Sequence, residues 1–222
     1  LVETLRNYVV PEVKYSQVEL DDKETGQPFL VTAMETLPLN FDKTKKYPVL
    51  FYIYGGPGSQ TVTKKWALSF SSLIAAELDA VVVTIDGRGT GFNNLNYKLG
   101  SKFKFIVRDR LGQYEPIDVI SAANKWAEKS YVDSERIAVW GWSYGGFLTL
   151  KTLETDIDNP IFNYAVAIAP VTRWRLYDSI YTERYLNTPQ ENPKGYETGS
   201  IHNVTNFKHV KKFLDRKSTR LN

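Results

Sequence analysis

Ser143 lies at the centre of Gly141-Trp142-Ser143-Tyr144-Gly145, which matches the pattern G-x-S-x-G. In enzymes with this pattern, the serine hydroxyl attacks an acyl carbon, and the backbone N–H of the next residue donates to the oxyanion. About 0.1 chance matches are expected in a chain of this length, so the surrounding sequence has to decide. The alternative is a turn that leads into a helix and carries an idle serine.

The neighbouring sequence has the order strand, turn, helix that this pattern requires. A β-rich apolar run, Arg136–Trp140, precedes the motif, and a helix-like run, Phe147–Leu153, follows it. A sharp turn lifts the serine clear of the sheet, and a side chain two residues before or after it would collide with the strand or helix. The sequence therefore predicts Ser143 as a nucleophile and the Tyr144 N–H as an oxyanion donor.

A second glycine-rich turn, Gly87-Arg88-Gly89-Thr90-Gly91, also follows an apolar run and resembles a dinucleotide fingerprint. A dinucleotide site needs a helix that begins immediately, so that its N-terminus faces the pyrophosphate. Residues 92–97 are poor helix formers. We therefore expect a structural loop beside the active site and no cofactor.

The composition excludes several kinds of site. The chain has no cysteine, which excludes disulfides, thiol catalysis and thiolate metal sites. Its two histidines, His202 and His209, are too few for a multi-histidine metal site, so no metal is expected. A net charge of +3 is too small to indicate nucleic acid or an anionic membrane as a partner.

The rest of the pattern predicts an α/β fold: a mostly parallel sheet with helices on both faces. Short apolar runs without alternation are typical of strands buried on both sides, and helical patterns lie between them. One predicted helix has Phe70, Leu73, Ile74 and Leu78 on one face, and another begins near Pro116. The predicted buried strands are 49–54, 80–85, 136–140 and 164–169.

The first forty residues have a different pattern. Residues 13–20 alternate apolar and polar side chains, as in a half-exposed strand, and residues 28–34 predict a second strand. We expect residues 1–40 to be the end of a preceding β region with entry strands, 41–214 to be a partial catalytic domain, and 215–222 to be an atypical tail.

Four segments together resemble one family. The nucleophile segment 141–146, the loop 86–91, the turn 54–59 and the tyrosine-rich segment 173–185 are similar to those of the prolyl oligopeptidase family, in its dipeptidyl peptidase IV branch. The match covers roughly residues 40–214. The sequence, with its absence of cysteine, resembles fungal dipeptidyl aminopeptidases more than animal enzymes. The resemblance implies the α/β-hydrolase fold.

The resemblance also implies roles for several aromatic residues. Tyr54 would place its hydroxyl in the oxyanion hole beside the Tyr144 N–H. A pocket for proline or alanine would be lined by Tyr177, Tyr181, Trp174, Val171 and Tyr144. The alternative for Tyr177, Tyr181 and Tyr185 is a helix whose rings pack into the core. We favour the pocket for Tyr177 and Tyr181, and the core for Tyr185.

The implied activity is that of a serine exopeptidase that releases X-Pro or X-Ala dipeptides from peptide N-termini. Alternatives are a prolyl oligopeptidase-like or acylaminoacyl-type peptidase, or a non-catalytic interaction relative. The implied partners are peptides with penultimate Pro or Ala, and a second copy in a homodimer of the full-length protein. The implied setting is the lumenal or extracellular side of the secretory pathway, vacuole or plasma membrane, as a glycoprotein held by an N-terminal anchor.

The resemblance fails towards the C-terminus. In this fold the catalytic Asp and then the His follow the Ser. Asp215, His202 and His209 come too early for these roles, so we expect the catalytic Asp and His to be absent from this chain and the chain alone to be inactive. The charged tail 215–222 is expected to lie outside the fold. Residues 1–4 show no signal peptide or initiator Met, so we expect the chain to be part of a longer protein.

Overall fold

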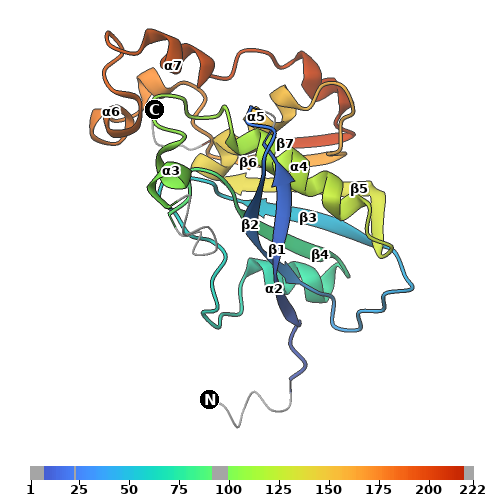
Figure 1. Cartoon of the computed structure of the whole chain (residues 1–222). Coiled ribbons are helices and arrows are strands. Elements are labelled where there is room, and N and C mark those ends of the chain that lie inside the picture. The colour runs from blue at the N-terminus through green and yellow to red at the C-terminus, as the bar shows by residue number, and fades with distance from the viewer. Residues whose placement is uncertain (1–7, 23, 92–99, 218–222) are drawn as a thin grey trace.

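A seven-stranded sheet forms the centre of the molecule in the computed structural model, which describes residues 8–22, 24–91 and 100–217 (Figure 1). The strands lie in the order β1-β2-β4-β3-β5-β6-β7. The strands are β1 (Val13–Asp21), β2 (Pro28–Thr36), β3 (Tyr47–Ile53), β4 (Val81–Asp86), β5 (Val132–Trp142), β6 (Tyr164–Ile168) and β7 (Lys212–Arg216). The helices are α2 (Phe70–Glu77), α3 (Gly100–Phe105), α4 (Glu115–Ala127), α5 (Tyr144–Thr155), α6 (Ser179–Leu186) and α7 (Pro193–Thr198), with short 3-10 turns η1 (Trp174–Leu176) and η2 (Thr205–His209).

Most of the sheet is parallel. The pairs β1–β2 and β2–β4 are antiparallel, whereas β4, β3, β5, β6 and β7 pair in parallel. All six residues of β4 are buried, as its uninterrupted apolar run predicts. The carboxyl ends of the five parallel strands meet at one edge of the sheet, where the loops of such folds carry ligand sites.

Helices cover both faces of the sheet, as two neighbouring residues of β3 show. The Phe51 ring contacts Trp126 of α4 with 5.8 Å between centroids, and the Tyr52 ring contacts Phe70 of α2 at 6.3 Å. Successive side chains of a strand point to opposite faces, so α4 and α2 lie on opposite sides. Helix α5 packs beside α4 and against β5 and β6 (Figure 1). The predicted fold class is confirmed.

Helix α2 forms where the sequence predicts it, but its buried face differs from the predicted one. Ser71 and Ala75 are the buried residues, whereas Leu73 and Leu78 are exposed. Small side chains let the helix approach the sheet closely, and Phe70 reaches across to Trp140 at 5.2 Å between ring centroids. The predicted apolar stripe is therefore mostly solvent-facing here.

Both ends of the described chain belong to the sheet. Strands β1 and β2, from the first forty residues, lie in the same sheet as β3. At the other end, β7 continues through Asp215 and Arg216, so the expectation that the tail lies outside the fold from residue 215 is wrong for these two residues. Residues 218–222 of the tail lie outside the described residues. Within the described ranges, no helix is long and apolar enough to span a membrane.

Candidate active site

Ser143 occupies the turn between β5 and α5, at the carboxyl edge of the sheet. Its backbone has φ 59° and ψ −114°, a conformation that L-residues rarely adopt. The turn is fixed by two hydrogen bonds: the Ser143 N–H donates to the Ile168 carbonyl at 2.9 Å, and the Phe147 N–H donates to the Ser143 carbonyl at 3.0 Å. The serine side chain is partly exposed. This is the geometry predicted for a nucleophile elbow.

The glycines of the motif are required by close packing. A Cβ on Gly141 would collide with the backbone of Gly145, and a Cβ on Gly145 would collide with the carbonyl oxygen of Ile53 in β3. A Cβ on Gly146 would lie 2.8 Å from the carbonyl oxygen of Ile168 in β6. The start of α5 therefore sits directly against the ends of β3 and β6, and this packing holds Ser143 in place.

Tyr54 follows β3 and lies at the same edge of the sheet. The register pairs Ile53 with Gly141, so Tyr54 comes directly after the point where β3 runs beside the serine turn. Its ring is half-buried, 6.2 Å from the Tyr144 ring between centroids. Burial raises the pKa of its hydroxyl, and the neighbouring Tyr177 and Tyr185 raise it further. The hydroxyl therefore stays protonated at neutral pH and can donate a hydrogen bond.

The backbone N–H of Tyr144 is free of intrahelical hydrogen bonds, so it can donate to an oxyanion. Tyr144 is the first residue of α5, and the first N–H groups of a helix have no acceptor within the helix. They carry the positive end of the helix dipole, which favours a developing negative charge beside Ser143. The Tyr144 side chain points away from solvent: it is 2% exposed, and its hydroxyl donates to Glu115 Oε1 at 2.7 Å.

The tyrosine-rich segment forms one aromatic cluster beside the elbow. Trp174 contacts Tyr144 at 5.5 Å, Tyr177 at 5.9 Å and Tyr181 at 6.0 Å between ring centroids. Tyr185 follows at 4.9 Å from Tyr181. Trp174 and Val171 are buried, whereas the three tyrosines of the segment are half-buried. The structure thus brings the predicted pocket residues together, with Tyr185 in the same row as Tyr181.

Both histidines of the chain lie at the other end of α5 from Ser143. The backbone N–H of His202 donates to Glu154 Oε1 at 2.8 Å, and Asn206, in the same 3-10 turn η2 as His209, donates to the Glu154 carbonyl at 2.8 Å. Glu154 and Asp156 mark the C-terminal end of the twelve-residue α5, roughly 17 Å from its first residue. His202 Nε2 is also within 2.6 Å of the Glu197 carbonyl, a position that suits a helix end.

Asp215 lies in the exposed edge strand β7, opposite Ala167 of β6. The Arg216 carbonyl accepts from the Ala169 N–H at 2.7 Å, so β7 ends at the same edge of the sheet as β6. Among the described residues, no group of three or more His, Cys, Asp or Glu side chains could hold a metal ion.

The glycine-rich turn after β4 packs against the loop after β3. Its four backbone N–H groups from Arg88 to Gly91 already have acceptors: a carboxylate oxygen of Asp118, and the carbonyls of Phe103, Gly87 and Ser59. A pyrophosphate would need such groups unpaired. The turn is therefore a structural loop in its described part; residues 92–97, which the sequence argument also used, lie outside the described residues.

Glu115 is the residue of this site for which the sequence gives little signal. An acidic residue before Pro116 favours the start of a helix, but nothing local shows that it meets Tyr144, 29 positions later in the chain. Glu115 is 2% exposed and lies in the first turn of α4. Burial raises the pKa of its carboxyl group, although the Tyr144 hydroxyl and two backbone N–H groups oppose this effect.

Comparison with known proteins places this geometry among peptidases. Residues 66–219 match the model of the prolyl oligopeptidase family. A protein of Trichophyton verrucosum named "Probable dipeptidyl-aminopeptidase B" is 52% identical over 214 residues, which is 96% of this chain and 22% of that protein. A protein of Coccidioides posadasii with the same name is 50% identical over 214 residues, with the same coverage.

A solved structure has a similar fold. The crystal structure of Porphyromonas gingivalis dipeptidyl peptidase 4 superposes with a TM-score of 0.82 and 33% sequence identity, over 96% of this chain and 28% of that chain. The chain thus spans about a fifth of the length of these curated relatives.

Proposed function

The chain belongs to the prolyl oligopeptidase family, and from this premise we propose that it carries the nucleophile of a serine-type dipeptidyl peptidase, which removes X-Pro or X-Ala dipeptides from peptide N-termini. The observation that carries the proposal is the conformation of Ser143, which is held at φ 59° between β5 and α5 by glycines that allow no side chain. The dipeptidyl aminopeptidases among its relatives support the exopeptidase activity.

In this mechanism, Ser143 Oγ attacks the carbonyl carbon of the scissile peptide bond. The oxyanion that forms is stabilised by the Tyr144 N–H and the Tyr54 hydroxyl, both at the carboxyl edge of the sheet. The peptide amine leaves as the acyl-enzyme forms, and water then hydrolyses the ester. A general base must take the proton of the serine hydroxyl and give it to the leaving amine; in the second step it takes a proton from water and returns it to Ser143 Oγ. Since neither histidine lies near Ser143, we propose that this base and its carboxylate partner come from residues outside this chain.

The aromatic cluster supports the proposed specificity. Tyr177 and Tyr181 meet edge to face at 5.6 Å between ring centroids, and Trp174 lies behind them. Rings in this arrangement form a short apolar wall that suits the flat pyrrolidine ring of proline or the methyl group of alanine. The rings themselves carry no charge, so a lysine or glutamate packed against them would lose part of its hydration without gaining an ionic partner from the rings.

The test is covalent labelling of the full-length gene product with a fluorophosphonate, followed by peptide mass spectrometry. Labelling at Ser143 is expected, together with release of Gly-Pro from a chromogenic dipeptide substrate. The Ser143→Ala variant should lose both, whereas Ser179→Ala, which changes an exposed serine at the start of α6, should keep both. Labelling that survives Ser143→Ala would contradict the proposal.

A further inference from the structure

The backbone N–H and the side chain of Tyr144 lie in different environments. Its backbone N–H faces the proposed oxyanion, while its ring is buried against Phe147 at 5.3 Å and Trp174 at 5.5 Å between centroids. A buried hydroxyl needs a hydrogen-bond partner. Here the partner is the carboxylate of Glu115 at 2.7 Å.

Glu115 is itself held rigidly. Its two carboxylate oxygens accept from the Gly112 N–H at 3.1 and 3.0 Å, and Oε2 accepts from the Tyr114 N–H at 3.2 Å. Gly112 has φ +78°, and a Cβ there would lie 2.7 Å from the Phe147 ring. The loop that ends at Glu115 therefore packs directly against α5, and the carboxylate cannot move without breaking backbone hydrogen bonds.

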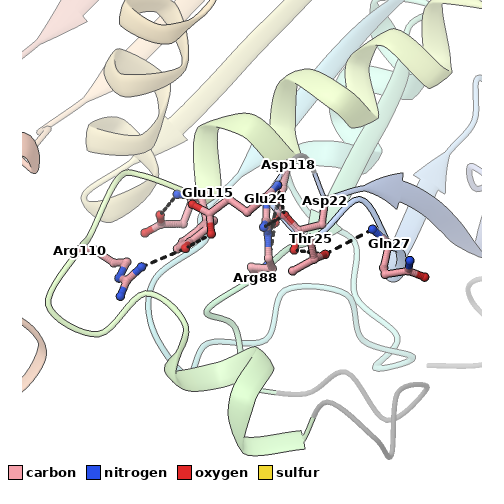
Figure 2. Close-up of polar contacts among 9 residues, drawn as sticks. Asp22, Glu24, Thr25, Gln27, Arg88, Arg110, Glu115 and Asp118 are labelled. Carbon is pink, nitrogen blue, oxygen red and sulfur yellow. Dashed lines mark hydrogen bonds and ion pairs between the residues drawn. The ribbon is translucent and has the colours of Figure 1, made fainter.

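A second carboxylate on the same helix fixes the start of α4 to the sheet. Figure 2 shows Arg88 pointing to Asp118, close to Glu115. Arg88 pairs with Asp118 at 2.6 Å and with Asp22, in the turn after β1, at 3.3 Å. Its guanidinium group also lies over the rings of Phe29 and Tyr114, at 4.7 and 4.6 Å from their centroids. The support of Glu115 thus extends to the loop after β4 and the β1–β2 hairpin.

From these contacts we propose that Glu115 is a positioning residue of the active site: its carboxylate holds the side chain of Tyr144, and thereby aims the Tyr144 backbone N–H at the oxyanion. The inference rests on the proposed function. The physical reason is the location of Tyr144 at the first position of α5, immediately after the strained serine. Few intrahelical hydrogen bonds restrain the N–H there, so the buried side chain provides much of the restraint.

The chain contains a matched pair for comparison. Glu35 is also buried, at 6% exposure, and accepts the hydroxyl of Tyr131 at 2.6 Å and the indole N–H of Trp126 at 2.7 Å. This pair lies at the other end of the thirteen-residue α4, about 20 Å from Glu115. Both pairs join a buried glutamate to a tyrosine hydroxyl, but Tyr131 is half-buried and Glu35 also pairs with Lys129 at 3.4 Å.

The experiment measures kcat and KM of the full-length gene product on a Gly-Pro chromogenic substrate, with active sites counted by fluorophosphonate titration. Glu115→Gln and Tyr144→Phe should each lower kcat by about 10- to 100-fold, since small misplacements of catalytic groups cost this much. KM should change by less than about threefold, because the bond to the oxyanion forms mainly in the transition state. The double variant should be no worse than the worse single variant.

Glu35→Gln and Tyr131→Phe are the controls. They should lower the melting temperature as the test variants do, but leave kcat per titrated site within about twofold, because a purely structural role does not act on the transition state. If Glu115→Gln does not fold, Tyr144→Phe, which removes one oxygen atom and keeps the ring, carries the test.

Two results would overturn the inference alone: an active protein in which Tyr144→Phe and Glu115→Gln keep kcat within twofold, or effects of the two substitutions that multiply in the double variant. In the second case, Glu115 would act by a route other than Tyr144. An unsubstituted protein that neither turns over the substrate nor is labelled at Ser143 would remove the proposed function, and this inference with it.

Discussion

Removal of the Tyr54 hydroxyl, a change of one oxygen atom, tests whether this group belongs to the oxyanion hole. If it donates to the oxyanion, Tyr54→Phe in the full-length gene product should lower kcat by about 10²–10³. KM should change little, since the ground-state carbonyl gains less from this donor. Steady-state kinetics on a Gly-Pro chromogenic substrate measure both constants.

Tyr52→Phe is the control for this prediction. Tyr52 belongs to the same strand end, but it stacks on Trp140 at 4.8 Å between ring centroids, on the α2 side of the sheet. The control variant should keep kcat. An unchanged kcat in Tyr54→Phe would make Tyr54 a packing residue.

The residues of the site differ in how far the sequence reveals them. The strained turn at Ser143 could be predicted because five consecutive residues and their flanking strand and helix carry the whole signal. Tyr177 and Tyr181 could be grouped by their spacing on one helical segment, although Tyr177 lies just before α6 rather than in it. Glu115 could not be predicted as the partner of Tyr144, because their contact arises only when α4 and α5 pack side by side.

Helix α5 is held at its C-terminal end by Glu154, and this contact makes stability depend on pH. Burial opposes ionisation of Glu154, but Lys151 at 2.7 Å and the N–H groups of Asn203 and His202 outweigh it, so its pKa lies below the ordinary value of 4.5. A carboxylate with a lowered pKa in the folded state stabilises the fold above pH 4.5. This stabilisation is lost as the pH falls through the folded-state pKa.

We therefore expect the free energy of unfolding to fall more steeply between pH 5 and pH 3 in the unsubstituted chain than in Glu154→Gln. Glutamine keeps an acceptor for the two N–H groups but cannot titrate. Urea unfolding at a series of pH values measures the slopes, and Glu197→Gln, at an exposed position of α7, is the control. Parallel slopes for the unsubstituted chain and Glu154→Gln would contradict this role.

The strands and helices could mostly be predicted from local pattern. Buried strands such as β4 read as continuous apolar runs because both faces are covered, and the sheet order explains why β1, at its edge, alternates instead. The buried face of α2 could not be predicted, because close approach to the sheet favours Ser71 and Ala75 over the larger Leu73 and Leu78. The last residues of β7 could not be predicted from their side chains either, since backbone pairing with β6 holds Asp215 and Arg216 in the sheet.

The 222 residues by themselves are expected to be inactive. Its two histidines lie at the far end of α5, so Ser143 has no imidazole to take its proton. Loss of the base leaves only the contributions of the oxyanion hole and of binding, so turnover should be at least about 10⁴-fold below that of an intact relative.

A Gly-Pro chromogenic assay of the purified chain, beside the Trichophyton verrucosum relative, measures this difference. Circular dichroism should first show that the chain is folded. Turnover within tenfold of the relative, abolished by Ser143→Ala, would show that a base exists among these residues and that the assignment of the base to another part of the protein is wrong.

The backbone of Ser143 also sets two selective pressures against each other. A residue with φ 59° and ψ −114° costs of order 1–3 kcal/mol of folding free energy, and glycine would remove most of that cost. Selection for stability alone would thus favour glycine at position 143, whereas only the reactivity of a hydroxyl favours serine. In a gene copy that no longer needs to hydrolyse a substrate, we therefore expect replacement of Ser143 by glycine to be among the first changes that selection for stability favours.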